Sequence, residues 1–152
     1  MKRFKFRYSA VVLILLLLVI VLMGVGLYFN IYNAVISIKE STTKFISHLL
    51  ISLLSLLLIA FSISVLISSK YLIKNGNLFV YFGFIKNKVD VNEIVEITHF
   101  KKSNKLVIYF SDQTYTVIVI SPEDYDDFVL ALREENKKIY FDTKIDGEDT
   151  PD

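Results

Sequence analysis

Two long uncharged segments dominate the first half of this chain and constrain its fold more than any other feature. They cover residues 10–29 (AVVLILLLLVIVLMGVGLYF) and 47–68 (SHLLISLLSLLLIAFSISVLIS). A helix of about 20 apolar residues is long enough to cross the roughly 30 Å hydrocarbon core of a bilayer. We therefore predict transmembrane helices over residues 10–29 and 47–69, joined by a short loop over residues 30–46. No A-x-A cleavage site follows the first segment, so we expect it to be retained rather than removed as a signal peptide.

The basic residues that flank these segments indicate how the chain is oriented. Residues 1–9 contain four Lys or Arg residues, the loop contains two, and Lys70 and Lys74 follow the second segment. Because the cytoplasmic flanks of membrane spans are enriched in Lys and Arg, we expect residues 1–9 to be a basic cytoplasmic N-terminus. The loop is then extracytoplasmic, and the chain after residue 69 is cytoplasmic again. This arrangement describes a two-span protein of the cell membrane with both termini in the cytoplasm.

Three serines of the second segment, Ser52, Ser55 and Ser62, lie close to one face of a helix. Two interpretations fit this spacing. The serine face packs against Gly24 and Gly26 of the first helix, since small residues let membrane helices approach closely. Alternatively, each hydroxyl bonds to a carbonyl of its own helix. The second interpretation is the simpler one because the sequence has no full GxxxG pattern.

From Lys70 onward the pattern changes to short alternating segments that are typical of β-strands. Asn75-Gly76 separates the first two segments and predicts a tight hairpin turn, because both residues tolerate positive φ. Gly83 lies inside the second segment and suggests a bulge or a bend. Strands are expected over residues 70–74, 78–84, 88–91, 94–100, 105–110 and 114–120.

A helix start signal follows the last of these strands. Ser121 is expected at the N-cap and Pro122 at the first helical position, and Asp124 completes an imperfect capping box. The apolar residues that follow form one stripe, Tyr125, Phe128, Val129 and Leu132. Such a stripe must cover another layer. We predict an α+β soluble domain over residues 70–142, in which a small antiparallel sheet or partly open barrel is capped by this C-terminal helix.

The residues after the predicted helix differ from the rest of the soluble half. Residues 139–141 are apolar enough for one more contact or a short strand. Residues 143–152 (TKIDGEDTPD) are polar and acidic, and we expect them to form a disordered tail.

The element order resembles the pleckstrin-homology (PH) superfold, with about six short strands followed by one amphipathic helix. More specifically, Asn75-Gly76, Gly83-Phe84-Ile85, VNEIVEI over residues 91–97 and the ISPED motif followed by Phe128 and Leu132 are similar to bacterial PH-like domains of the YyaB-like type. Many of these domains follow one or two membrane spans. The resemblance covers roughly residues 50–135 and implies a PH-like fold, but it implies little about activity because such folds host many binding roles.

One departure from the better-known PH domains limits what this resemblance implies. Phosphoinositide-binding PH domains carry a basic K-x(n)-[KR]-x-R run across the first hairpin. Residues 70–77 contain no Arg and break that pattern. We therefore do not carry phosphoinositide binding over to this chain.

Residues suited to catalysis are scarce. The chain has no Cys, only two His residues, and neither a G-x-S-x-G motif nor a phosphate-binding loop. Asp124, Asp126 and Asp127 lack the glycine and terminal Glu of a calcium loop, and the positive end of the helix dipole already explains them. We predict that the protein is not an enzyme and holds no cofactor and no metal.

Charge is distributed unevenly along the chain. Residues 1–69 contain six Lys and Arg against one acidic residue, a net of +5, whereas the remainder contains 11 against 15, a net of −4. The acidic soluble half disfavours nucleic-acid binding. Two basic turns remain as candidate contacts for anionic lipid head groups or a partner: Lys86 and Lys88, and Lys101, Lys102 and Lys105. The simpler interpretation is that these lysines are solvated and protect exposed turns and edges.

The leading functional hypothesis is a membrane-anchored, cytoplasm-facing PH-like module that recruits or modulates a protein partner at the inner membrane. Contact would run through a sheet edge or the basic turns, and the hairpin would fix the domain at the lipid bilayer. The alternative is a membrane stress factor, or an immunity factor against antimicrobial peptides, that acts through its two spans.

Overall fold

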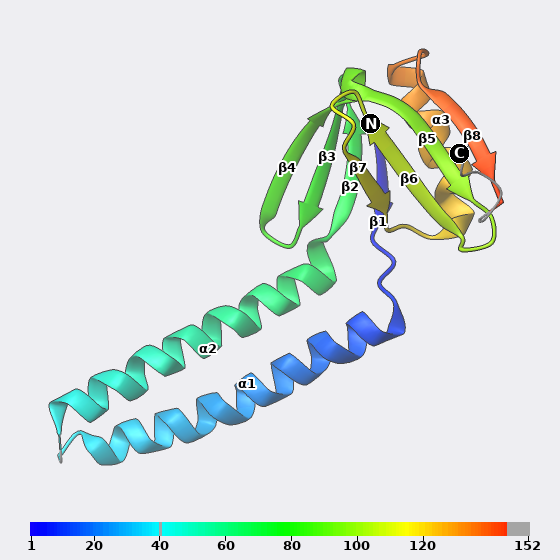
Figure 1. The fold of residues 1–152 in the computed structure, drawn as a ribbon. Coiled ribbons are helices and arrows are strands. Elements are labelled where there is room, and N and C mark those ends of the chain that lie inside the picture. Colours follow the sequence, from blue (N-terminus) through cyan, green and yellow to red (C-terminus); the bar gives the residue numbers. More distant parts are fainter. Residues whose placement is uncertain (40, 146–152) are drawn as a thin grey trace. The chain divides into compact units, whose positions relative to one another are not determined.

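The computed structural model describes residues 1–39 and 41–145, which form two units. The helical unit comprises Ser9–Ser68 together with Phe82–Phe84. The other unit is rich in β-strands and contains the remaining described residues. Figure 1 shows the two helices and the two sheets.

The helical unit contains two long antiparallel helices, α1 (Ala10–Ser37) and α2 (Thr42–Ser68). The Ser9 hydroxyl caps α1 by accepting a hydrogen bond from Val12 N–H at 3.3 Å. Both helices are long and apolar enough to cross a membrane. They extend beyond the predicted bounds and shorten the predicted loop, because no Gly or Pro interrupts the helix beyond Phe29 or before Ser47.

Contacts inside this unit support the two interpretations of the serine face only in part, since the buried Ser52 hydroxyl has no hydrogen-bond partner among the described residues. The Ser55 hydroxyl donates to the Ile51 carbonyl of its own helix at 2.9 Å. A methyl group added at Gly24 or Gly26 would meet nothing within 4 Å, so the serines do not pack against these glycines. A polar contact between the helices lies elsewhere, where His48 Nδ1 and Asn30 Oδ1 are 3.1 Å apart.

The second unit is built from two four-stranded sheets. The first has the order β1-β2-β3-β4 and the second the order β7-β6-β5-β8. The strands of the first sheet are β1 (Lys2–Lys5), β2 (Lys70–Lys74), β3 (Asn77–Phe82) and β4 (Ile85–Asp90). The strands of the second sheet are β5 (Ile94–Phe100), β6 (Lys105–Phe110), β7 (Tyr115–Ile118) and β8 (Tyr140–Lys144). The neighbouring pairs with a defined register are antiparallel except β5 and β8, which are parallel.

Strand β1 is the main feature that the sequence analysis did not anticipate, since it assigned residues 1–9 only as a basic N-terminus. β1 pairs with β2 in antiparallel register, although the whole helical hairpin separates the two strands in the chain. Phe4 points into the core and is 7% exposed. Beyond the strand, the Arg7 N–H donates to the Val119 carbonyl at 3.0 Å. The segment before the hairpin therefore contacts both sheets.

Two glycines occupy turns that require positive φ. Asn75 and Gly76 have φ values of 52° and 70°, which confirms the predicted hairpin turn between β2 and β3. Gly83 has a φ of 60° and lies in the turn after β3, so the predicted strand over residues 78–84 ends earlier and its last residues form a bend. Within the helical unit, a methyl group on Gly83 would lie 3.1 Å from Val65 Cγ2 and 3.2 Å from Ser64 Oγ. A side chain at this position is therefore disfavoured by both backbone conformation and space.

The predicted C-terminal helix begins with a short 3-10 turn (Pro122–Asp124) and continues as α3 (Tyr125–Glu135). Strand β8 then follows α3, where the sequence predicted a contact or short strand over residues 139–141. β8 includes Thr143 and Lys144, which the sequence analysis assigned to a disordered tail. The rest of that predicted tail, residues 146–152, lies outside the described residues.

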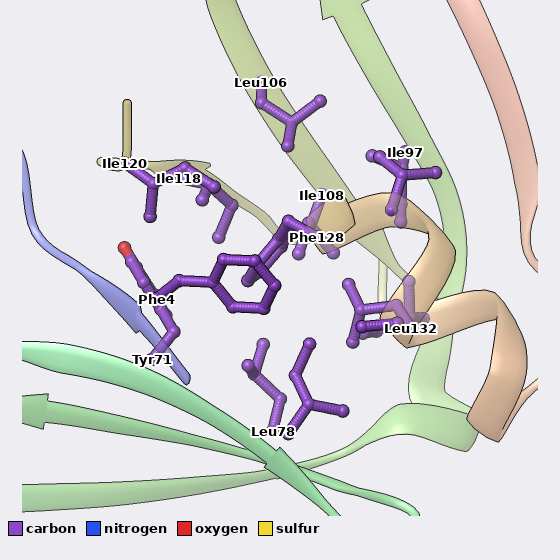
Figure 2. Close-up of a cluster of buried hydrophobic side chains, with 14 of the residues drawn as sticks. Phe4, Tyr71, Leu78, Ile97, Leu106, Ile108, Ile118, Ile120, Phe128 and Leu132 are labelled. Atoms are coloured by element: carbon purple, nitrogen blue, oxygen red, sulfur yellow. The ribbon is translucent and has the colours of Figure 1, made fainter. Parts of the chain in front are cut away.

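The apolar stripe of α3 fills the space between the two sheets. Figure 2 shows Phe128 surrounded by Phe4 and Tyr71 from the first sheet and by Ile108 from the second. Phe128 and Leu132 are both 0% exposed. The helix therefore closes a core to which both sheets and the segment before the hairpin contribute, as the sequence pattern of α3 predicted.

Candidate functional site

The outer face of the β1–β4 sheet carries lysines and aromatic rings. Lys5 pairs with Lys70, and Lys70 pairs with Tyr81, so the three side chains form one row across β1, β2 and β3. Directly paired residues point to the same side of a sheet. Their neighbours Phe4 and Tyr71 point into the core, which places the row on the outer face. A second row on this face consists of Arg3, Leu72 and Phe79.

Lysine side chains lie over the aromatic rings of this face. The Lys70 ammonium is 5.3 Å from the centre of the Tyr81 ring. Lys86, from β4, is 4.5 Å from the Phe79 ring centre and 5.8 Å from the Tyr81 ring centre. Two ammonium groups therefore share one tyrosine ring, at distances where the ring quadrupole attracts a cation. We call Lys5, Lys70, Lys86, Phe79 and Tyr81 the lysine–aromatic face.

Within the part of the chain that the structure describes, the cations of this face have no carboxylate partner. Among residues 1–39 and 41–145, no carboxylate oxygen lies within 4 Å of the ammonium groups of Lys5, Lys70 or Lys86. Lys2, in contrast, forms an ion pair at 3.4 Å with Glu134. Positive charge thus collects on one face of a unit whose sequence from Lys70 onward is acidic overall. This face is suited to binding an anionic ligand or surface.

The structure separates the five candidate lysines into two groups. Lys86 and Lys88 lie on β4 in the first sheet. Lys101 and Lys102 lie in the β5–β6 turn of the second sheet, and Lys105 begins β6. All five are exposed, but only Lys86 lies over aromatic rings among the described contacts.

An open groove accompanies the second group of lysines. Lys105 lines it together with an apolar and aromatic surface on the second sheet: Phe100, Ser103, Val107, Tyr109, Tyr115 and Val117. Tyr115 is 67% exposed and belongs to β7, which is at one edge of its sheet. This groove is a second candidate surface, and its aromatic character suits a protein partner.

The predicted helix-cap residues hold the positions expected of them but not all of the contacts. Ser121 lies at the N-cap of the 3-10 turn and Pro122 at its start, yet the Ser121 side chain makes no capping hydrogen bond. Its hydroxyl accepts a hydrogen bond from the Arg7 guanidinium at 3.3 Å instead. Asp124 is the N-cap of α3 and also makes no side-chain cap bond. These residues have a structural role at the junction with the segment before the hairpin.

Part of the chain is similar to a known protein family. Residues 69–136 match the family described as "Bacterial PH domain". The fold of this segment is PH-like. The segment contains β2 to β7 and α3, whereas β1 and β8 lie outside the matched residues. A search of curated proteins and a search of solved structures each gave no match. The chain therefore has the predicted architecture, a PH-like domain and a hairpin of two apolar helices.

Two tyrosine hydroxyls link separate elements within the PH-like domain. The Tyr71 hydroxyl accepts a hydrogen bond from Val119 N–H at 3.3 Å, next to the contact made by Arg7. Burial raises the pKa of the Tyr71 phenol, and this hydrogen bond partly opposes the rise. Tyr125 of α3 donates to the Asn104 carbonyl at 2.8 Å and thereby fixes the β5–β6 turn that carries Lys101 and Lys102.

Sequence patterns alone do not reveal the whole lysine–aromatic face of the PH-like domain. In the sequence, Lys5 and Lys70 serve only to indicate membrane topology. The signal that could have identified Lys5 is the alternation of residues 2–7, KRFKFR, in which Phe4 and Phe6 stand between cations. Such alternation is typical of a strand with one buried face.

Proposed function

We propose that this protein is a membrane-anchored binding module whose PH-like domain faces the cytoplasm and recruits or modulates a protein partner. PH domains are typically binding modules rather than enzymes. The ISPED motif supports the finer assignment to the YyaB-like type. The main support for this proposal is the pairing of β1 with β2, two strands that the helical hairpin separates in the chain.

This pairing constrains the topology. β1 precedes α1 and β2 follows α2, so the two strands can pair only when both outer ends of the hairpin are on one side of a membrane. Two spans satisfy this requirement and one span does not. The paired ends carry more Lys and Arg than the connection between α1 and α2, which supports a cytoplasmic location for the PH-like domain.

Single-cysteine labelling tests this topology cleanly because the chain has no Cys. Ser103→Cys lies in the exposed β5–β6 turn, and Ser41→Cys lies between the two helices. In intact cells, a membrane-impermeant maleimide should label the Ser41→Cys protein and should leave the Ser103→Cys protein unlabelled until the cells are opened. Labelling of Ser103→Cys in intact cells would contradict the proposed orientation.

We propose that the partner binds at the open groove and the neighbouring turn of the second sheet. The groove combines the exposed ring of Tyr115 with the lysines of the β5–β6 turn, and Lys101, Lys102 and Lys105 are all exposed. An exposed aromatic residue beside cations is the composition that recurs at protein interfaces. A partner of complementary shape with acidic residues at its rim would fit this surface.

Site-specific photocrosslinking of the full chain in its own membrane tests the partner. A photoreactive residue at Tyr115 should give a defined protein adduct, whereas the same residue at Tyr140, which is 61% exposed on β8, should not. The substitution Lys101→Glu/Lys102→Glu/Lys105→Glu should abolish the adduct. Equal yields of the adduct from both positions, or no adduct from either, would indicate that the PH-like domain does not bind the partner. That result would favour the alternative in which the helices act in membrane stress or immunity.

A further inference from the structure

We propose that the lysine–aromatic face is a docking surface for the anionic phospholipid head groups of the membrane that holds the helices. This inference rests on the proposed membrane anchoring and adds a second, lipid-facing role to the PH-like domain. It concerns the first sheet, whereas the proposed protein partner binds the second sheet.

The geometry concentrates positive charge in a small area. Lys5, Lys70 and Tyr81 form one row by strand register, and Lys86 reaches the same tyrosine ring from β4. Like charges that lie directly opposite on neighbouring strands destabilise a sheet. Among the described residues no carboxylate lies within 4 Å to offset this repulsion. An external anion would offset it.

The aromatic component of the face suits a bilayer surface. Phe79 and Tyr81 are half-buried on the outer side of β3, beneath the lysine ammonium groups. Tyrosine rings favour the level of the lipid head groups, where an apolar ring and a polar hydroxyl are both accommodated. Lysine in turn supplies a compact charge on a flexible stem, which reaches phosphate oxygens without requiring a fixed geometry.

Chain connectivity favours lipid over a soluble anionic partner. Only Ser69 stands between Lys70 and the last residue of α2, and four residues stand between Lys5 and the first residue of α1. One extended residue spans at most about 3.6 Å, so Lys70 cannot lie far from the bilayer surface at which a membrane-spanning α2 would end. The potential of an anionic leaflet extends over about 10 Å. Lys70 is therefore held within reach of anionic head groups.

Tryptophan quenching in the full chain tests this proposal. The protein has no Trp, so Tyr81→Trp provides a single reporter on the face. The chain is reconstituted into vesicles that contain equal amounts of a zwitterionic and an anionic phospholipid, with brominated acyl chains on one lipid or the other. Tyr115→Trp, on the outer face of the second sheet, is the matched reporter.

Enrichment of anionic lipid predicts that the Tyr81→Trp reporter is quenched at least about twofold more strongly when the anionic lipid carries the bromine, and that the Tyr115→Trp reporter shows a ratio of about one. Adding the substitution Lys5→Gln/Lys70→Gln/Lys86→Gln should return the ratio of the Tyr81→Trp reporter to about one. The control Lys101→Gln/Lys102→Gln/Lys105→Gln removes the same number of charges and should leave the ratio unchanged. High salt should reduce the ratio.

The outcomes separate this inference from the proposed function. A chain that fails to float with the vesicles would overturn the membrane anchoring itself. A chain that floats, but whose Tyr81→Trp reporter is quenched equally by both lipids, would overturn the lipid docking and leave the anchoring intact. If this reporter is shielded from both lipids, the face does not contact the bilayer, and the lipid docking is overturned. An unchanged ratio in the Lys5, Lys70 and Lys86 variant would exclude these lysines as the contacts.

Discussion

Replacing Phe128 by alanine should lower the free energy of unfolding of the PH-like domain by about 3–5 kcal/mol. Phe128 is 0% exposed. Its ring centre lies 5.0 Å from that of Phe4 and 5.7 Å from that of Tyr71, both in edge-on geometry. Removing the ring forfeits these contacts and leaves a cavity between the sheets. A loss of this size is a large part of the total stability of a small domain.

Hydrogen exchange of the full chain in nanodiscs measures this effect in the β6 amides, which report the opening of the second sheet. The matched control is Leu130→Ala, since Leu130 lies on the same helix and is 53% exposed. The control should change the opening free energy by less than about 0.5 kcal/mol. Similar losses in both variants would contradict the placement of Phe128 at the centre of the core.

The second large effect is expected from Phe4→Ala, in a strand that lies outside the matched PH family segment. Phe4 is 7% exposed and touches Phe128, so its removal should destabilise the PH-like domain by about 3 kcal/mol or more. Arg3→Ala is the control, because Arg3 is the exposed neighbour in the same strand. If Phe4→Ala behaves like Arg3→Ala in hydrogen exchange, β1 is not part of the domain core.

The two substitutions together test the contact itself. Residues in direct contact give non-additive effects, and an aromatic pair contributes about 0.5–1.5 kcal/mol beyond the area that it buries. The double variant Phe4→Ala/Phe128→Ala should therefore be less destabilised than the sum of the single variants by about that amount. Strict additivity would show that the two rings do not interact.

Local patterns predicted much of the PH-like domain. β2, β5 and β6 have the predicted bounds, because each ends at a clear turn such as Asn75-Gly76. The stripe of α3 correctly indicated a helix that covers an open core. These features are encoded by neighbours in sequence, so residue pattern and turn chemistry are sufficient to find them.

Features that depend on distant segments were harder to predict. β1 is a strand because it pairs with β2, which follows the hairpin in the chain. No residue near β1 in the sequence indicates that β2 is its partner. β4 is an edge strand with few apolar residues, so its sequence IKNKVD was partly assigned as a polar break. The row of Lys5, Lys70 and Tyr81 exists only through strand register. Three distant segments form it, and their separate composition does not reveal it.

The pairing of β1 with β2 also has a consequence for biosynthesis. A ribosome makes β1 first, then both helices, and only afterwards the strand with which β1 pairs. If the helices are inserted into a membrane as proposed, the strand that contains the core residue Phe4 has no partner strand until insertion is complete. A hairpin inserted with its ends on opposite sides would leave β1 without its partner and the core incomplete. With the proposed anchoring, completion of the domain would distinguish correctly inserted chains, because a misinserted chain would expose apolar surface to chaperones and proteases.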